Sequence, residues 1–237
     1  MNAQSRPMIP TGSDRLDELL NGGLTPQLVH LVYGEAETGK TTLAIQCAVN
    51  CARKGLKTIY IDSENTFSPK RLTQIATNDA KDIAPNIILA RPKSFKEQSA
   101  ILDKMESYLT EKVALIIVDT VSSLYSAELG SESKSTFKFN RELNRQLASL
   151  AQIAKTHKIA ALVTSQVRSV FTATEADFEP VARRVMKFWA NVIISLRPTP
   201  QGNVIRAVLE KHPKQLRPES CFLRIVAEGI KDYEQPG

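Results

Sequence analysis

The chain has 237 residues and a formal net charge of +6, with 42% hydrophobic and 24% charged residues. This is an ordinary globular mixture, and no segment approaches the roughly 20 consecutive apolar residues of a membrane-spanning helix, which excludes a transmembrane protein. The length predicts one large domain with a sizeable core. The positive charge is compatible with an anionic partner, but many proteins with such a charge bind none.

The N-terminus and the cysteines indicate the cellular compartment in which we expect the protein to work. The first ten residues, MNAQSRPMIP, lack the apolar core of a secretory signal, so we expect a cytoplasmic protein. Cys47 and Cys51 fall on one face of a predicted helix, and Cys221 is remote from both. This arrangement favours reduced packing thiols over a disulfide framework.

The predicted elements begin with a short helix over residues 11–23, with Ser13 as its N-cap. Strand-like and helical patterns then alternate, and the helical ones cover 40–54, 96–111 and 138–157. The strand-like runs are LVHLVYG, TIYIDSE, NIILARP, ALIIVDT, AALVTSQ and NVIISLRP. Apolar runs flanked by helices are typical of parallel strands covered on both faces. The sequence therefore predicts an α/β fold with a doubly wound, mostly parallel sheet.

The pattern changes after residue 198, where strand-like stretches with turn signals predict antiparallel hairpins at one edge of the sheet. Two polar stretches, 122–136 and 167–180, have no clear period, and we expect them to be loops. Each follows a predicted core strand directly. Because ligands gather at the carboxyl ends of strands in open parallel sheets, both stretches are candidates for function.

The segment GEAETGKT fits the phosphate-loop pattern G-x-x-x-x-G-K-[ST], and it lies between an apolar strand and a helical pattern. Its backbone N–H groups are expected to converge on phosphate oxygens, with Lys40 on the β- and γ-phosphates and the Thr41 hydroxyl on Mg²⁺. The predicted nucleotide-binding residues of this segment are Gly34, Glu35, Ala36, Glu37, Thr38, Gly39, Lys40, Thr41 and Thr42.

Three further polar residues end predicted core strands. Asp119 ends ALIIVDT and is expected to support Mg²⁺, while Glu64 follows the second strand and is a candidate for polarising the attacking water. Gln166 ends another strand, where its amide could contact the γ-phosphate and report its loss to the following loop. The alternative for Glu64 is a solvated carboxylate at a strand end.

Together these motifs resemble the ATPase core of the RecA/RadA recombinase family, and within it the short archaeal paralogues of RadA. The matching segments, in the family's order, are PTGSDRLDELLNGGL, GEAETGKTTLA, YIDSENTFSPKRL, LIIVDTVSSL, LNRQLASLAQIAKTHKIAALVTSQV and VLEKHPKQLRPESCFLRIVAEGIKD. The resemblance implies a single RecA-like core over residues 1–237, with 1–10 a short extension and no separate N-terminal DNA-binding domain.

The resemblance also implies weak ATPase activity with ATP and Mg²⁺ as cofactors. The implied catalytic residues are Glu64, Lys40 and Gln166; Thr41 and Asp119 support the metal, and Arg71 lies beside the adenine. The implied partners are DNA, single-stranded in the first place, the main recombinase RadA, a Holliday-junction nuclease and further copies of the chain. The two stretches expected to be loops correspond to the DNA-facing loops of recombinases.

Basic residues beside these two stretches are candidates for following a phosphate backbone. The predicted DNA-binding residues are Lys134, Lys138, Arg168, Arg183 and Arg184. Arg141 and Arg145 also lie near the first stretch, but they alternate with Glu142, and a solvated helix face explains them equally well. Phe171 and Phe178 either stack on bases or pack inward.

Two functions from different classes fit these observations. The first is a DNA-binding recombination and repair protein that hydrolyses ATP slowly at Glu64. The second is a protein-interaction module in which ATP only sets the conformation and hydrolysis is not needed. A relative of the replicative helicases or a small-molecule kinase is disfavoured, because an additional helical domain or lid arginines are missing from the pattern.

Overall fold

The computed structural model describes residues 6–131, 136–171, 176–215 and 217–234. Its strands are β1 (Val29–Gly34), β2 (Lys57–Asp62), β3 (Ile87–Ala90), β4 (Val113–Asp119), β5 (Ala160–Phe171), β6 (Ala176–Pro180), β7 (Val192–Pro198), β8 (Val204–Lys211), β9 (Glu219–Val226) and β10 (Gly229–Asp232). All ten strands in this part of the chain belong to one sheet, in the order β10-β9-β8-β7-β1-β5-β4-β2-β3, with β6 paired to β5.

The direction of the strands divides the sheet in two. Strands β7, β1, β5, β4, β2 and β3 pair in parallel, while β8, β9 and β10 extend the sheet beside β7 in antiparallel order. This confirms the predicted α/β class, the mostly parallel doubly wound sheet and the antiparallel strands at the C-terminal edge.

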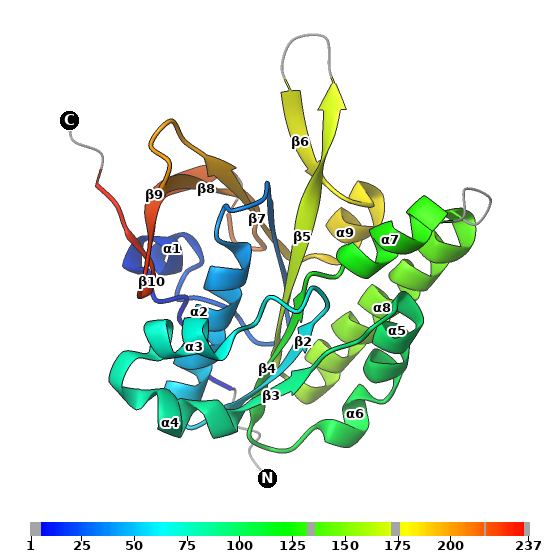
Figure 1. The fold of residues 1–237 in the computed structure, drawn as a ribbon, viewed down its shortest axis with the longest axis horizontal. Coiled ribbons are helices and arrows are strands. Elements are labelled where there is room, and N and C mark those ends of the chain that lie inside the picture. The colour runs from blue at the N-terminus through cyan, green and yellow to red at the C-terminus, as the bar shows by residue number, and fades with distance from the viewer. Residues whose placement is uncertain (1–5, 132–135, 172–175, 216, 235–237) are drawn as a thin grey trace.

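Helices cover both faces of the sheet (Figure 1). One layer consists of α1 (Asp14–Leu19), α2 (Lys40–Arg53), α3 (Pro69–Ala76) and α4 (Ala80–Ile83). The other consists of α5 (Phe95–Asp103), α6 (Met105–Tyr108), α7 (Ser123–Ser131), α8 (Thr136–His157) and α9 (Arg183–Trp189). None of the helices in the described residues is long and apolar enough to cross a membrane.

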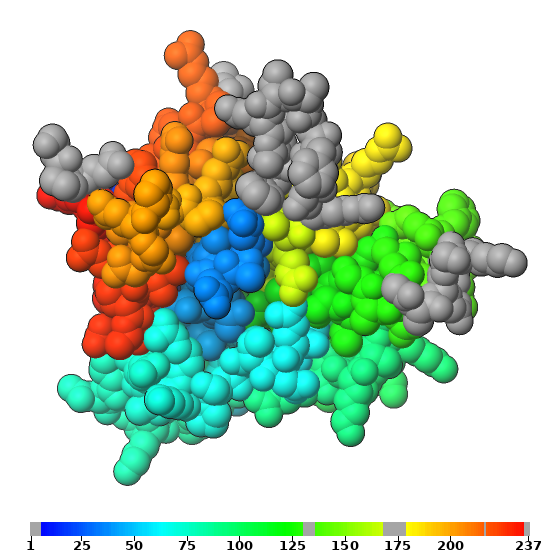
Figure 2. All heavy atoms as spheres, turned by 45° about the horizontal axis from the view of Figure 1, so that its top comes forward, coloured from blue at the N-terminus to red at the C-terminus, as the bar shows by residue number. Residues whose placement is uncertain are grey.

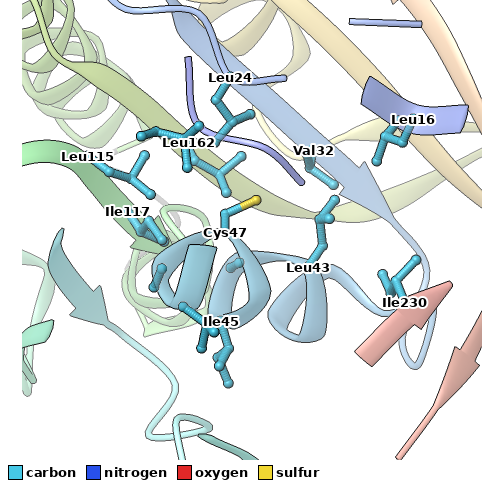
Figure 3. Packing of buried hydrophobic residues seen from close by; sticks show 14 of the residues in the cluster. Leu16, Leu24, Val32, Leu43, Ile45, Cys47, Leu115, Ile117, Leu162 and Ile230 are labelled. Atoms are coloured by element: carbon cyan, nitrogen blue, oxygen red, sulfur yellow. The ribbon is translucent and has the colours of Figure 1, made fainter. Parts of the chain in front are cut away.

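Strand residues alternate between two buried cores, one beneath each helix layer. In β1, Val32 faces the core of α2, whereas Leu31 and Tyr33 face the core of α8. Figure 3 shows Leu43 and Cys47 of α2 packed close to Val32 in the first core. Because every residue of β1 and β4 is buried, these strands read as continuous apolar runs in the sequence.

Local signals decide where the first helices begin. The Ser13 side chain accepts a hydrogen bond from the backbone N–H of Leu16, which confirms it as the N-cap of α1. Helix α2 begins after Gly39, which has a φ of 86° in the left-handed region that favours glycine. The chain therefore turns sharply from β1 into α2 at the carboxyl edge of the sheet.

The structure corrects three expectations from the sequence. The stretch 122–136 contains helix α7, because Tyr125 is buried and forms an edge contact with Phe95 of α5, and this packing overrides the weak local periodicity. The stretch 167–180 contains an antiparallel hairpin, since β5 continues beyond the main sheet and pairs with β6. The helical pattern over 96–111 contains two helices, α5 and α6, instead of one.

Candidate nucleotide-binding site

A cavity of about 530 Å³ lies at the carboxyl edge of the parallel strands. In Figure 2, which brings this edge forward, the blue segment after β1 reaches the surface between the red and orange C-terminal strands and the cyan segment after β2. The cavity is lined by Ala36, Glu37, Gly39, Lys40, Thr41, Thr42, Glu64, Thr66, Thr120, Gln166, Val167 and Ile225. Residues from the phosphate-loop motif therefore share one cavity with Glu64 and Gln166.

The two glycines of the phosphate loop have close neighbours where a side chain would begin. A Cβ on Gly34 would lie 2.4 Å from the carbonyl oxygen of Leu196, and one on Gly39 would lie 3.0 Å from Ile225 Cδ1. The Thr38 hydroxyl donates to the Glu35 carbonyl oxygen over 2.8 Å. Gly39, the N-cap of α2, has no side chain that could form a capping hydrogen bond, and the N–H groups at such a helix N-terminus can bind an anion.

Lys40, the first residue of α2, is buried and points back along the loop. Its Nζ donates to the carbonyl oxygen of Gly34 over 2.9 Å and to that of Glu35 over 2.5 Å. Burial lowers the pKa of Lys40, while the charges of Asp119, Glu64 and Glu35 oppose this shift. The ammonium group therefore lies among carboxylates and backbone oxygens at the mouth of the loop.

Asp119 lies at the end of β4 and is fully buried. Its Oδ2 accepts a hydrogen bond from the Tyr60 hydroxyl over 2.7 Å, and its Oδ1 accepts one from the Thr164 hydroxyl over 2.5 Å. Burial raises the pKa of Asp119, and hydrogen bonds from Thr164, Tyr60 and Thr41 oppose this shift. The hydroxyl of Thr41 and the carboxylate of Asp119 therefore lie together, and both are hard oxygen ligands of the kind that Mg²⁺ prefers.

Glu64 follows β2 and is only half-buried. Its Oε1 accepts hydrogen bonds from the Thr120 hydroxyl over 3.0 Å and from Gln166 Nε2 over 2.6 Å. Gln166 belongs to β5, at the point where this strand leaves the main sheet toward the hairpin. Glu64, the candidate base, is therefore in direct contact with Gln166 at the start of the hairpin.

Arg71 lies outside the residues that line the cavity. Its guanidinium donates to the carbonyl oxygens of Val226, the last residue of β9, and Ala227, in the turn that follows, and to the Thr42 hydroxyl. The structure therefore places Arg71 beside the phosphate-loop helix, where it ties α3 to the C-terminal edge of the sheet. Its expected position beside the adenine remains a prediction.

The predicted DNA-binding residues that the structure describes lie at the starts of two helices, α8 and α9. Lys138 is exposed at the start of α8, while Arg183 and Arg184 are exposed at the start of α9, and Arg183 forms an ion pair with Glu179 of β6. Lys134 lies outside the described residues, and so does the side chain of Arg168. The assignment of DNA contacts remains a prediction.

Sequence reasoning missed four residues that line the cavity: Thr66, Thr120, Val167 and Ile225. Thr120 and Val167 directly follow Asp119 and Gln166, so their positions after core strands were the signal that could have identified them. Ile225 comes from β9, more than 180 residues after the phosphate loop in the chain, and no local pattern identifies it.

The comparisons with known proteins agree with this geometry. The family model described as Rad51 matches residues 4–233. The chain belongs to the Rad51 family. This confirms the resemblance to the RecA/RadA recombinases that the sequence motifs predicted.

Several archaeal proteins of the Rad51 family are similar over almost their whole length. Proteins described as "DNA repair and recombination protein RadB" include one from Methanococcoides burtonii, 36% identical over 91% of this chain and 94% of its own. Another, from Thermococcus kodakarensis, is 35% identical over 96% of this chain and 100% of its own. A solved structure of the RadB recombinase has a TM-score of 0.82 and 35% identity, covering 96% of this chain and 100% of its own. The predicted likeness to the short archaeal paralogues of RadA is therefore confirmed.

Proposed function

We propose that this protein binds ATP with Mg²⁺ and hydrolyses it slowly while it acts on DNA in homologous recombination and repair. The observation that carries the proposal is that one cavity is lined by the Lys40 ammonium, the N-terminus of α2, the Glu64 carboxylate and the Gln166 amide. The Asp119 carboxylate is buried behind this lining, next to the Thr41 hydroxyl. The similar archaeal proteins described as RadB support the assignment to repair and recombination.

The residues of the cavity fit a nucleoside triphosphate and a divalent cation. Lys40 and the N–H groups at the start of α2 bind the phosphates, and Gly39, whose left-handed φ turns the chain into α2, has no side chain to cover them. Thr41 and Asp119 hold Mg²⁺, which neutralises phosphate charge when bound. Glu64 orients the attacking water and accepts its proton, and Gln166 holds that carboxylate in place.

The DNA-binding surface is proposed to include the ends of α8 and α9, next to α7 and the hairpin of β5 and β6. Lys138, Arg183 and Arg184 are exposed there, and Lys134 and Arg168 belong to the same segments of the chain. Cations in such positions release counterions when phosphates bind, so affinity is expected to fall steeply with salt. Single-stranded DNA, RadA, a Holliday-junction nuclease and further copies of the chain are the proposed partners.

One contact favours the second function, in which ATP sets conformation without being hydrolysed. Gln166 Nε2 donates to Glu64 Oε1 over 2.6 Å, so the carboxylate is joined to the strand that leads into the hairpin. A nucleotide that displaces this amide would be sensed at the hairpin before any chemistry occurs. In this case the protein regulates the main recombinase or the nuclease as an ATP-gated module.

Steady-state ATP hydrolysis by the wild type and Glu64→Gln, with and without single-stranded DNA, tests the first function. We expect the variant to bind ATP with unchanged affinity and to lose about a hundredfold in kcat, because it lacks the proton acceptor. Unchanged hydrolysis in Glu64→Gln would remove Glu64 from the mechanism.

A strand-exchange assay reconstituted with RadA separates the two functions. If Glu64→Gln still supports RadA while Lys40→Ala does not, the ATP-gated module is the better description. If both variants fail, hydrolysis itself is required.

A further inference from the structure

A chain of buried polar side chains crosses the apolar core between α5 and α8. Ser63 is 5% exposed, Gln98 0%, Ser99 7% and Gln146 1%. Their neighbours in this core include Leu102, Leu143 and Leu147. Burial of two amides and two hydroxyls among leucines is costly unless each finds a hydrogen-bond partner.

The partners form a single line. The Ser63 hydroxyl donates to Gln98 Oε1 over 2.8 Å, Gln98 Nε2 donates to Gln146 Oε1 over 2.7 Å, and Gln146 Nε2 donates to the Ser99 hydroxyl over 2.5 Å. The Ser99 hydroxyl donates in turn to the carboxylate of Glu142. We call this line the polar relay.

All donors of the polar relay point the same way, from Ser63 toward Glu142. The line ends on a carboxylate, which accepts hydrogen bonds only, so reversal of either amide would place two donors or two acceptors against each other. Arg145 holds the outer end, because its guanidinium binds both Glu142 and Asp103 at the surface. The negative charge of Glu142 near the surface therefore determines the direction of the hydrogen bonds in the polar relay, including the one from Ser63 to Gln98.

The inner end adjoins the nucleotide pocket. Ser63 directly precedes Glu64, and its backbone N–H donates to the carbonyl oxygen of Asp119 over 2.8 Å. After Glu64 the chain turns through Asn65, which has a φ of 56° in the left-handed region. Ser63 is thus held from the sheet through its backbone and from α5 through its side chain, at the last position before the candidate base.

We propose that Gln98 is a positioning residue, which acts through Ser63 to hold the backbone of Glu64 in its reactive orientation. The inference rests on the proposed function, since it gives Glu64 the role of proton acceptor. A link that served only to join α5 to α8 would be complete with the bonds from Gln98 to Gln146 and from Ser99 to Glu142. The bond to Ser63 does not join the two helices to each other; it connects α5 to the segment directly after β2.

Two variants separate positioning from packing. Ser63→Ala removes the inner bond and leaves the bonds between α5 and α8 intact, whereas Gln98→Met removes the amide but keeps the length of the side chain. We expect each to lower kcat for ATP hydrolysis by about tenfold with the KM for ATP changed by less than about twofold. In the double variant the losses should not multiply, because both changes break one connection.

The matched control is Gln46→Met. Gln46 is also a buried glutamine with two hydrogen bonds, to the backbone N–H and carbonyl oxygen of Ile230, but it lies on the opposite face of the sheet. We expect Gln46→Met to melt at a lower temperature than the wild type. At temperatures where the variant is folded, its kcat should equal that of the wild type. An equal loss of kcat in Gln46→Met would show that kcat only follows stability, and would overturn the proposal.

Hydrogen exchange gives a readout that does not depend on hydrolysis. In Ser63→Ala and Gln98→Met we expect the amides of residues 63–66 to exchange about tenfold faster, with those of β4 unchanged. If Glu64→Gln keeps full activity but this local acceleration is seen, the base assignment fails and with it the catalytic purpose of the positioning, although the hold of Gln98 on residues 63–66 is demonstrated. Unchanged exchange at 63–66 in both variants would overturn the positioning role whatever the activity.

Discussion

The candidate nucleotide site has a deep end at Asp119, which is buried behind the cavity, and a shallow end at Glu64, which lines it, and the two ends are built differently. Asp119 is fully buried and accepts hydrogen bonds from Tyr60 of β2 and Thr164 of β5, so two neighbouring strands hold it. Glu64 is half-buried and accepts hydrogen bonds from Thr120, directly after β4, and from Gln166, at the point where β5 leaves the parallel part of the sheet.

The difference shows which end of the pocket can respond to a ligand. Movement of Asp119 would break hydrogen bonds inside the sheet, where the penalty for an unpaired group is highest. Glu64 can change partners at lower cost because water reaches it and Gln166 is exposed. We therefore expect Asp119, at the deep end, to keep its position when the metal binds. Glu64, at the shallow end, is expected to change its hydrogen-bond partners when the nucleotide binds.

The largest effect is expected where the two ends meet, at Lys40, whose charge interacts with both Asp119 and Glu64. Lys40→Ala leaves these carboxylates without their cation and removes the direct contact with the phosphates. We expect ATP affinity to fall by about a hundredfold or more, or about 3 kcal/mol, in isothermal titration calorimetry. Lys54→Ala, an exposed lysine just beyond the end of α2, is the control and should bind ATP as the wild type does. Equal affinity in both variants would contradict the role of Lys40.

An intermediate effect is expected when the deep end is weakened. Tyr60→Phe removes the hydroxyl that donates to Asp119 Oδ2 and leaves a buried carboxylate with fewer donors. We expect the free energy of unfolding to fall by about 1–3 kcal/mol in urea denaturation. Gln166→Ala at the shallow end should change it by less than about 0.5 kcal/mol, since Gln166 is exposed. Similar losses in the two variants would mean that the two ends do not differ in the way described.

The smallest effect concerns the outer end of the polar relay. The hydrogen bond from Arg145 lowers the pKa of Glu142 below its ordinary value of 4.5, with burial opposing. A carboxyl group with a lowered pKa in the folded state adds stability above pH 4.5, and this stability is lost as the pH falls through the folded pKa. The melting temperature of the wild type should therefore exceed that of Glu142→Gln near about pH 6 and approach it toward about pH 3. A difference that stays constant over this range would show that the charge of Glu142 does not contribute.

Much of the pocket was predictable because its residues follow strands in a recognisable local pattern. The phosphate loop and Glu64 come just after strands, Asp119 is the last residue of β4, and Gln166 ends the part of β5 that pairs with β1. The carboxyl ends of parallel strands meet at one edge of the sheet. Ile225 was not predictable, since it reaches the cavity only through the antiparallel edge strands. The same holds for Arg71, whose partners at the end of β9 and in the turn that follows are remote in sequence.

The alternation of strands and helices, the α/β class, the phosphate loop and the likeness to the recombinases all follow from the amino-acid sequence. These features depend on local periodicity and on residues that are close in the chain. The helix over 123–131, the extension of β5 into a hairpin, and the hydrogen bonds by which Gln98 and Gln146 connect Ser63 to α8 became visible in the folded molecule. Each of these features depends on packing and hydrogen bonds between segments that are distant in sequence. Local sequence patterns do not specify which distant segments will meet.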